Sequence, residues 1–205
     1  MRITNIEYQK NNKRVNIYID NKFAFGMSDE LRFKFGLSID DEINQDFIDN
    51  VIKSEEQMKV TNAAFNLLSF RQRSEKELCD ALKRKGFEDS YISHTINYLK
   101  ENNYLDDKKF AKSFIYDKQN LNKYGPNKIR YELYKKGISK DIIESTVIKD
   151  SNTEYDMALE LAAKKLTNYK SQDKASIYRK LGNLLQRKGY SYDVILKVLD
   201  NLIND

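Results

Sequence analysis

The feature that most constrains the fold is a short sequence that recurs at intervals of 51 and 52 residues. Each copy ends an amphipathic segment with Lys-Gly and a bulky apolar residue, at 85–87, 136–138 and 188–190. Other positions keep step with the glycine: leucine four residues before it, leucine or isoleucine eight before it, and isoleucine six after it. This periodicity predicts stacked repeats that bury their apolar faces against one another.

The composition of the 205 residues suits a soluble folded protein, with 40% hydrophobic and 33% charged residues. Apolar residues come singly rather than in runs of about eighteen, and the N-terminus carries no secretory stretch. We therefore expect a cytoplasmic protein that does not enter the membrane. The single cysteine, Cys79, excludes an intramolecular disulfide and a multi-cysteine zinc site.

Charge is segregated along the chain, although the net charge is only +5. Residues 28–56 hold nine acids and three bases, whereas residues 108–140 hold ten bases and two acids. Residues 164–190 add eight bases against Asp173 alone. The basic segments fit a polyanionic partner such as DNA or an acidic protein groove, and they fit equally well a set of solvated lysine-rich helices.

The first 27 residues differ from the rest because apolar side chains alternate there. Residues 3–8, 15–19 and 23–25 predict three short strands with turns between them, which form a small antiparallel meander over 1–27. Helical spacing over 28–35 and 45–54, on either side of a turn at Gly36, predicts an acidic helical connector over 28–55.

The remaining sequence predicts a mainly α-helical protein with three tandem three-helix repeats, over 56–102, 103–152 and 153–205. In each repeat the second helix ends at Lys-Gly, with the glycine in the left-handed conformation. The predicted helix starts are the capping box at Ser74, the N-cap Asp106 and the Gly125-Pro126 pair. The first repeat should open with a helix over 57–70. The third repeat is the most diverged and its second helix is expected over 177–188.

No residues form a recognisable catalytic, metal or cofactor site. The seven glycines build no phosphate-binding loop, and His94 has no second ligand at metal spacing. Asp106 and Asp107 resemble a catalytic carboxylate pair, but helix-start electrostatics explains both. We expect no enzyme activity, no cofactor and no small-molecule substrate.

What remains is a basic surface built in a similar way in each repeat, because cations precede every glycine. The candidate partner-binding or DNA-binding residues are Arg71, Arg73, Lys83, Arg84, Lys85, Lys128, Arg130, Lys135, Lys136, Arg187 and Lys188. Cations at a helix C-terminus also stabilise the helix dipole, and this alone explains one lysine per helix. Tyrosines interleave with these bases, as stacking on single-stranded nucleic acid requires, although many are expected to be half-buried.

Three motifs in this order resemble the RecX family, the bacterial regulators of the RecA recombinase. They are residues 71–78 with Leu82 and Lys85-Gly86, Tyr104-Leu105-Asp106-Asp107 with Phe110-Ala111, and Gly125 with Ile129, Leu133 and 136–138. The strand-rich N-terminus is similar to the longer form found in low-GC Gram-positive bacteria. The resemblance implies a curved, elongated array of three three-helix repeats that binds the RecA filament on single-stranded DNA and mainly inhibits its ATPase and strand exchange in DNA repair.

Two other interpretations fit the same residues. The chain could be a sequence-independent nucleic-acid binder that acts without the recombinase, in which case it binds bare DNA tightly and in a salt-sensitive way. It could instead be a helical scaffold for an acidic protein partner.

Overall fold

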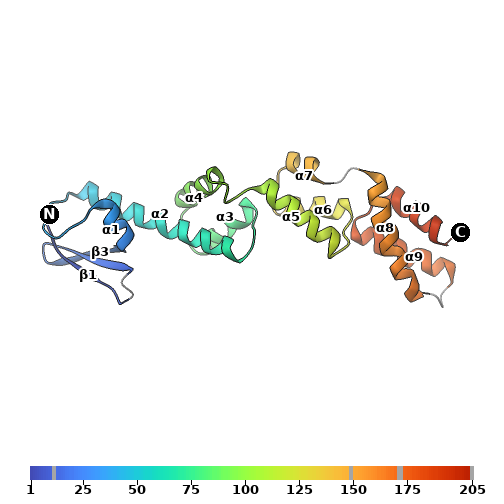
Figure 1. Ribbon diagram of the computed structural model, residues 1–205, viewed down its shortest axis with the longest axis horizontal. Helices are drawn as coiled ribbons and strands as arrows, with labels where there is room; N and C mark the ends of the chain where they lie inside the picture. Colours follow the sequence, from blue (N-terminus) through green and yellow to red (C-terminus); the bar gives the residue numbers. More distant parts are fainter. Residues whose placement is uncertain (11–12, 148–149, 170–172, 204–205) are drawn as a thin grey trace. The chain divides into compact units, whose positions relative to one another are not determined.

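The computed structural model describes residues 1–10, 13–147, 150–169 and 173–203. The chain forms two compact units. Figure 1 labels the helices and strands within them. The first contains residues 1–71 and 79–99, and the second contains residues 72–78 and 100–205. Within these described ranges there are ten α-helices, one short 3-10 helix and a single three-stranded sheet, so the predicted mainly α-helical class is confirmed.

The N-terminal meander is an antiparallel sheet of β1 (Ile3–Tyr8), β2 (Arg14–Ile19) and β3 (Lys22–Ser28), in that order. Its strands alternate as predicted, and Ile3, Val15 and Ile17 are fully buried on one face. Helix α1 (Asp29–Phe35) follows directly, with Ser28 as its N-cap, and adds Leu31 to this core.

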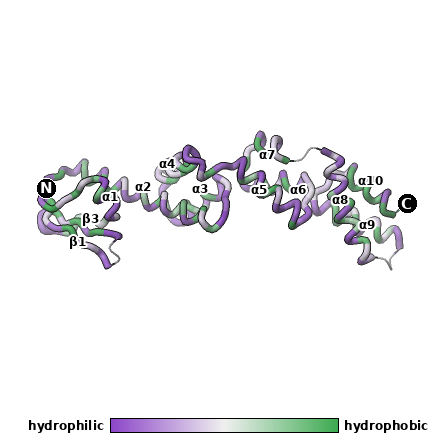
Figure 2. Tube along the Cα trace, in the orientation of Figure 1, coloured by the Kyte–Doolittle hydropathy of each residue, from purple (hydrophilic) through white to green (hydrophobic). Residues whose placement is uncertain are grey.

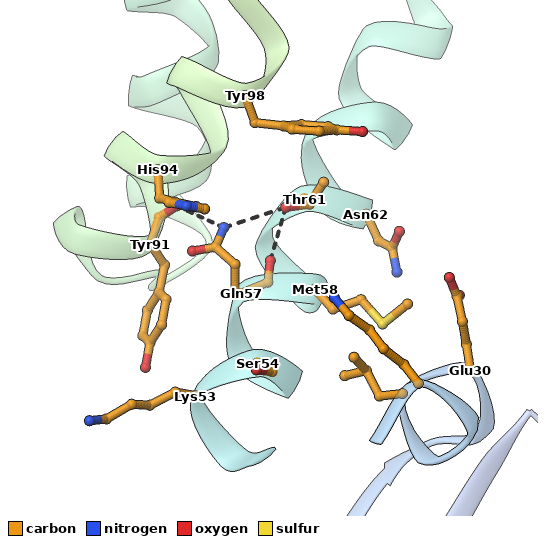
Figure 3. Close-up of a pocket in the computed structure, with 12 residues that line it drawn as sticks. Glu30, Lys53, Ser54, Gln57, Met58, Thr61, Asn62, Tyr91, His94 and Tyr98 are labelled. Atoms are coloured by element: carbon orange, nitrogen blue, oxygen red, sulfur yellow. Dashed lines mark hydrogen bonds between the residues drawn. The ribbon is translucent and has the colours of Figure 1, made fainter. Parts of the chain in front are cut away.

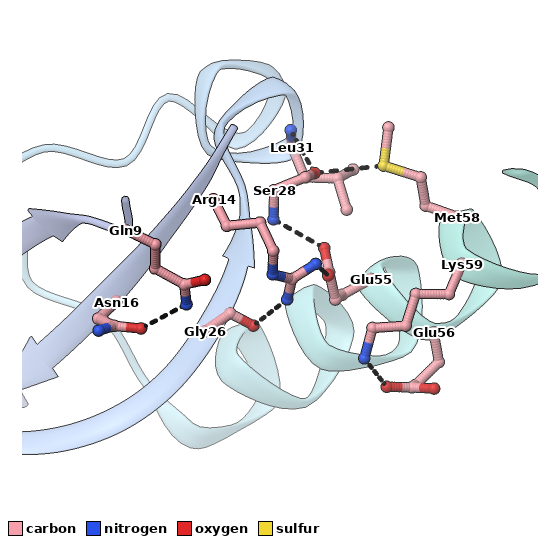
Figure 4. Close-up of polar contacts among 10 residues, drawn as sticks. All are labelled: Gln9, Arg14, Asn16, Gly26, Ser28, Leu31, Glu55, Glu56, Met58 and Lys59. Carbon is pink, nitrogen blue, oxygen red and sulfur yellow. Dashed lines mark hydrogen bonds and ion pairs between the residues drawn. The ribbon is translucent and has the colours of Figure 1, made fainter. Parts of the chain in front are cut away.

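Helix α2 (Gln45–Phe70) is one continuous helix of 26 residues, so the prediction of a connector helix and a separate repeat helix was wrong. The intervening Ser54-Glu55-Glu56 contains neither glycine nor proline, and nothing there interrupts the backbone. Glu55 is also anchored to the sheet. Its carboxylate lies 2.6 Å from Arg14 Nη1 and accepts the Ser28 amide at 2.9 Å, as Figure 4 shows.

Each repeat has three helices, and α2 is the first helix of repeat one. They are α3 (Glu75–Arg84), α4 (Asp89–Glu101), α5 (Asp107–Asn120), α6 (Pro126–Lys135), α7 (Lys140–Thr146), α8 (Ser151–Leu166), α9 (Lys174–Lys188) and α10 (Tyr192–Ile203), with the 3-10 helix at Thr167–Tyr169.

The predicted core register is confirmed. The residues four and eight positions before each glycine are completely buried, namely Leu78, Leu82, Ile129, Leu133, Leu181 and Leu185. Figure 2 shows hydrophobic residues spaced along the helices rather than gathered into long runs. No helix in the described part of the chain is both long and apolar enough to cross a membrane.

Most helix ends lie where the sequence predicts them. Asp106 accepts the amides of Lys108 and Lys109, Gly125 precedes Pro126 at the start of α6, and Gly86, Gly137 and Gly189 all have positive φ. The start of α9 was predicted too late. The Asp173 side chain accepts the Ser176 amide, which begins this helix at Lys174, a full turn before Ile177 in the glycine register.

Candidate functional site

The Lys-Gly ending of α6 is a packing surface as well as a helix stop. The Ser74 hydroxyl, at the start of α3, donates to the Lys136 carbonyl at 2.6 Å. A Cβ placed on Gly137 would lie 2.5 Å from Cβ of Lys76. The start of the second helix in repeat one therefore rests directly on the ending of the second helix in repeat two.

The same junction recurs between the second and third repeats. The Gly125 amide donates to the Lys188 carbonyl at 2.8 Å, and the Asn127 amide donates to the Gly189 carbonyl at 3.0 Å. A Cβ on Gly125 would lie 2.6 Å from the Gly189 carbonyl carbon, so the two backbones touch. The period in the sequence thus marks the joints of the array, closed by a side chain-to-backbone bond between repeats one and two and by backbone bonds between repeats two and three.

The Lys-Gly ending of repeat one is open. Among the described residues other than its chain neighbours, none has an atom within 4 Å of the position that a Gly86 Cβ would take, and Lys85 is exposed. The apolar residue after the glycine reports the same difference, since Phe87 is half-buried while Ile138 and Tyr190 are buried. Burial raises the pKa of Tyr190 to about 12.

Two of the candidate cations have partners within the fold. Nζ of Lys136 lies 2.5 Å from Oε1 of Glu77 in a half-buried ion pair. Nζ of Lys188 donates to the Asn122 carbonyl at 2.6 Å. The sequence showed the cations but not the groups that the repeat junctions bring to them.

The other candidate cations differ in exposure and in the residues that they contact. Arg84, Lys85 and Arg187 are exposed, while Lys83 is exposed and paired with Asp89 at 2.9 Å. Lys135 lies over the Tyr131 ring at 4.5 Å, and its hydrogen bond to that tyrosine raises the pKa of the ammonium group. The remaining positions are Arg71 at the end of α2, Arg73 beside Ser74, and Arg130, whose guanidinium donates to Asn127.

The structure also brings together a group that the sequence did not predict. The Tyr124 ring has three ammonium groups around it, from Lys128 at 4.2 Å, Lys188 at 5.2 Å and Lys118 at 5.9 Å. Lys118 was not a candidate. The signal that could have found this group is the glycine register, which places Lys128 of repeat two at the position of Glu77 in repeat one.

Asp106 and Asp107 have separate structural roles. Asp106 caps α5, and the amide of Lys109, followed by that of Lys108, holds the pKa of its carboxyl below the ordinary value. Asp107 accepts the Glu75 amide at 2.8 Å, and burial raises its pKa. Both carboxylates accept amides at helix starts, in agreement with the interpretation of these residues from sequence, but only the lowered pKa of Asp106 comes from such bonds, since burial outweighs the Glu75 amide at Asp107.

A cavity of about 680 Å³ lies in the first unit between α1, α2 and α4 (Figure 3). Gln57 donates to the Thr95 hydroxyl at 2.7 Å and to the Tyr91 carbonyl at 3.3 Å, so the central polar groups of this wall bond to one another. His94 lies on the same wall and is exposed. The described residues include no cluster of three or more potential metal ligands.

Comparison with known proteins gives matches along almost the whole chain. Family models match the RecX N-terminal domain over residues 1–44 and the first, second and third RecX three-helix domains over 61–99, 106–147 and 152–199. Proteins named Regulatory protein RecX are 39% identical over 98% of this chain and 96% of theirs in Clostridioides difficile, and 39% identical over 100% of this chain and 97% of theirs in Clostridium perfringens.

Solved structures agree with these matches. A crystal structure of regulatory protein RecX superposes with a TM-score of 0.78 and 26% identity, covering 97% of this chain and 98% of that one. RecX from Lactobacillus salivarius gives a TM-score of 0.67 and 31% identity, over 73% of this chain and 97% of that one.

Proposed function

Since this chain belongs to the RecX family of regulatory proteins, we propose that it is a non-catalytic regulator of the RecA recombinase that binds the recombinase filament on single-stranded DNA. The observation that carries the proposal is that the match runs through the N-terminal domain and all three repeats. A chain with every part of the family's architecture is expected to share the family's partner.

The surface chemistry supports a macromolecular partner. Each repeat carries cations at the end of its second helix. In repeats one and two, some of these cations are exposed and take no part in the junctions, as with Lys85 and Lys135. Cations spaced by a structural repeat suit a polymer that presents acidic groups at intervals. In this proposal the chain lies along the filament and slows ATP hydrolysis and strand exchange by restraining the movement of the recombinase subunits.

The direct test is single-stranded-DNA-dependent ATP hydrolysis by the cognate RecA, measured with increasing amounts of this protein. We expect the rate to fall to a plateau at saturation. An ATPase rate and a strand-exchange yield that both stay unchanged at saturating protein contradict the proposal.

The open ending of repeat one offers a mutational test that spares the fold. Arg84 and Lys85 are exposed, and no ion pair involves them within the residues that the structure describes. The variant Arg84→Glu with Lys85→Glu should fold normally yet require about tenfold more protein for half-maximal inhibition, because reversed charges repel an acidic filament surface. Lys53→Glu with Lys59→Glu, on α2, is the control with the same net charge change.

A further inference from the structure

The two repeat junctions differ in charge at one equivalent position. Nine residues before the glycine, repeat one has Glu77 and repeat two has Lys128. The residue that each faces, one position before the next glycine, is lysine both times, Lys136 and then Lys188. The first junction is therefore closed by opposite charges, whereas the second brings two like charges together.

The geometry of the second junction holds these cations close to each other. Lys128 and Lys188 lie 4.2 and 5.2 Å from the centre of the Tyr124 ring, so their ammonium groups are within about 10 Å, one Debye length at 0.1 M salt, of each other. Lys118 adds a third charge 5.9 Å from the same ring. All three side chains are half-buried, which limits their freedom to move apart.

Neutral groups hold these lysines in place. Lys188 donates to the Asn122 carbonyl at 2.6 Å, and Lys128 donates to the Arg187 carbonyl at 3.3 Å. Among the residues that the structure describes, no carboxylate forms an ion pair with Lys118, Lys128 or Lys188. Two acids near Tyr190 have other partners: Glu160 pairs with Lys123 at 3.1 Å, and Glu154 accepts the Ser191 amide at 2.6 Å.

We propose that Lys118, Lys128 and Lys188 form a binding site for the phosphodiester backbone of a nucleic acid, which supplies the negative charge that Glu77 supplies at the first junction. The fold keeps the cations together before a ligand arrives, because the Gly125 and Gly189 backbones fix the junction. A phosphate then gains three partners at once and relieves their mutual repulsion.

The lysines that surround Tyr124 decide what the site recognises. A base cannot stack on a ring face that an ammonium group already occupies, so this tyrosine positions cations and does not read bases. We therefore expect binding without sequence preference. This site rests on the proposed function and gives the regulator a direct contact with DNA. Binding to bare DNA, without RecA, tests the site separately from the regulation of RecA.

The test substitutes Lys128→Glu, which recreates the residue of the first junction. The new carboxylate should pair with Lys188 and leave the fold at least as stable as the wild type. Binding of the full chain to a fluorescent oligothymidylate is measured by anisotropy across about 50–200 mM salt. We expect a loss of at least about tenfold in affinity and a salt slope smaller by about 0.7, because the site no longer neutralises its one phosphate.

Two further variants keep the result decisive. Lys197→Glu, an exposed position on α10, has the same change in net charge and should bind as the wild type. Lys118→Met removes one cation from α5 without touching the junction glycines and should lower affinity by a few fold, whether or not Lys128→Glu folds.

Wild-type affinity and salt slope for folded Lys128→Glu would overturn the inference, as would wild-type binding by folded Lys118→Met. An equal loss for Lys197→Glu overturns it as well, because the effect would then follow net charge alone. If Lys128→Glu binds bare DNA normally but no longer affects RecA, the three lysines contact a protein and the nucleic-acid assignment is wrong.

Discussion

Nζ of Lys136 lies 2.5 Å from Oε1 of Glu77, and this ion pair joins residues that are 59 positions apart in the sequence. Both side chains are about one-fifth exposed, so water screens the pair less than it screens an ion pair on the surface. The contact closes the junction between the first two repeats, next to the hydrogen bond from Ser74 to the Lys136 carbonyl.

A double-mutant cycle on this pair should give a measurable coupling. Glu77→Gln, Lys136→Met and the double variant are expected to show a coupling free energy of about 1 kcal/mol, from thermal unfolding followed by circular dichroism. The exposed pair Glu56–Lys59 is the control and should couple by less than about 0.5 kcal/mol. Equal coupling in both cycles would mean that the Glu77–Lys136 pair stabilises the junction no more than an exposed ion pair stabilises a helix surface.

Alanine at the glycines of the three Lys-Gly endings should cost different amounts of stability. Gly86→Ala introduces only the strain of a left-handed residue, about 1 kcal/mol, because its surroundings are open. Gly137→Ala adds an overlap with the Lys76 side chain, and Gly189→Ala adds one with the Lys128 backbone, which cannot move aside. We expect the order Gly86, Gly137, Gly189, with the last above about 3 kcal/mol, by thermal unfolding. A uniform cost at all three positions would mean that the glycines act only as helix stops.

The neighbouring residues Asp106 and Asp107 should give opposite dependences of stability on pH. The folded pKa of Asp106 is lowered, so its contribution is present above the unfolded pKa and disappears as pH falls through the folded pKa. The folded pKa of Asp107 is raised, so its contribution is present at low pH and disappears as pH rises through the folded pKa. Melting temperatures of Asp106→Asn and Asp107→Asn, measured from about pH 2 to 7, test both signs.

At neutral pH, Asp106→Asn should melt below the wild type, and Asp107→Asn should melt at or above it, since asparagine can still accept the Glu75 amide without a buried charge. Both differences should shrink in acid, where the wild-type carboxyls are protonated. A loss of stability in Asp107→Asn at neutral pH would contradict the assigned sign.

Glu55 should be the most sensitive acid of α2. Replacement by glutamine leaves Arg14 without its partner charge and is expected to destabilise the first unit by about 2 kcal/mol, since Arg14 is one-third exposed and water softens the loss. Glu56→Gln, the next residue, removes only an exposed ion pair and should change stability by less than about 0.5 kcal/mol. Hydrogen exchange of the Ser28 amide, which donates to Glu55 at the end of β3, checks both expectations.

The buried positions, the helix stops and the meander follow from local sequence. Leu82, Leu133 and Leu185 keep one register because each faces the core of its own repeat. The glycines can be recognised as helix stops because the left-handed conformation at a helix end favours glycine. Two ends were misplaced for local reasons. A domain boundary assumed from the repeat length was given more weight than the lack of a helix-breaking residue at Ser54-Glu55-Glu56, and α2 in fact continues through these residues. The N-cap Asp173 was not recognised.

The candidate surface was less predictable, because charge in a sequence carries no information about partners far along the chain. Lys136 and Lys135 are adjacent, yet one is paired with Glu77 and the other is exposed beside Tyr131. Only the packing of one repeat on the next distinguishes them. Comparison of equivalent positions between repeats, Glu77 against Lys128, carries part of that information and needs no structure.

The unbroken helix α2 also bears on how the first unit can bind. At 26 residues it extends about 39 Å, with Glu55 fixed to the sheet and Gln57 bonded to Thr95 of α4. Tandem modules joined by a flexible linker lose entropy when both engage one target. In this chain the continuous helix fixes the sheet relative to the first helix of repeat one during folding, so that this entropy is not lost again on binding. An insertion of two or three residues after Glu56 would rotate one contact surface away from the other.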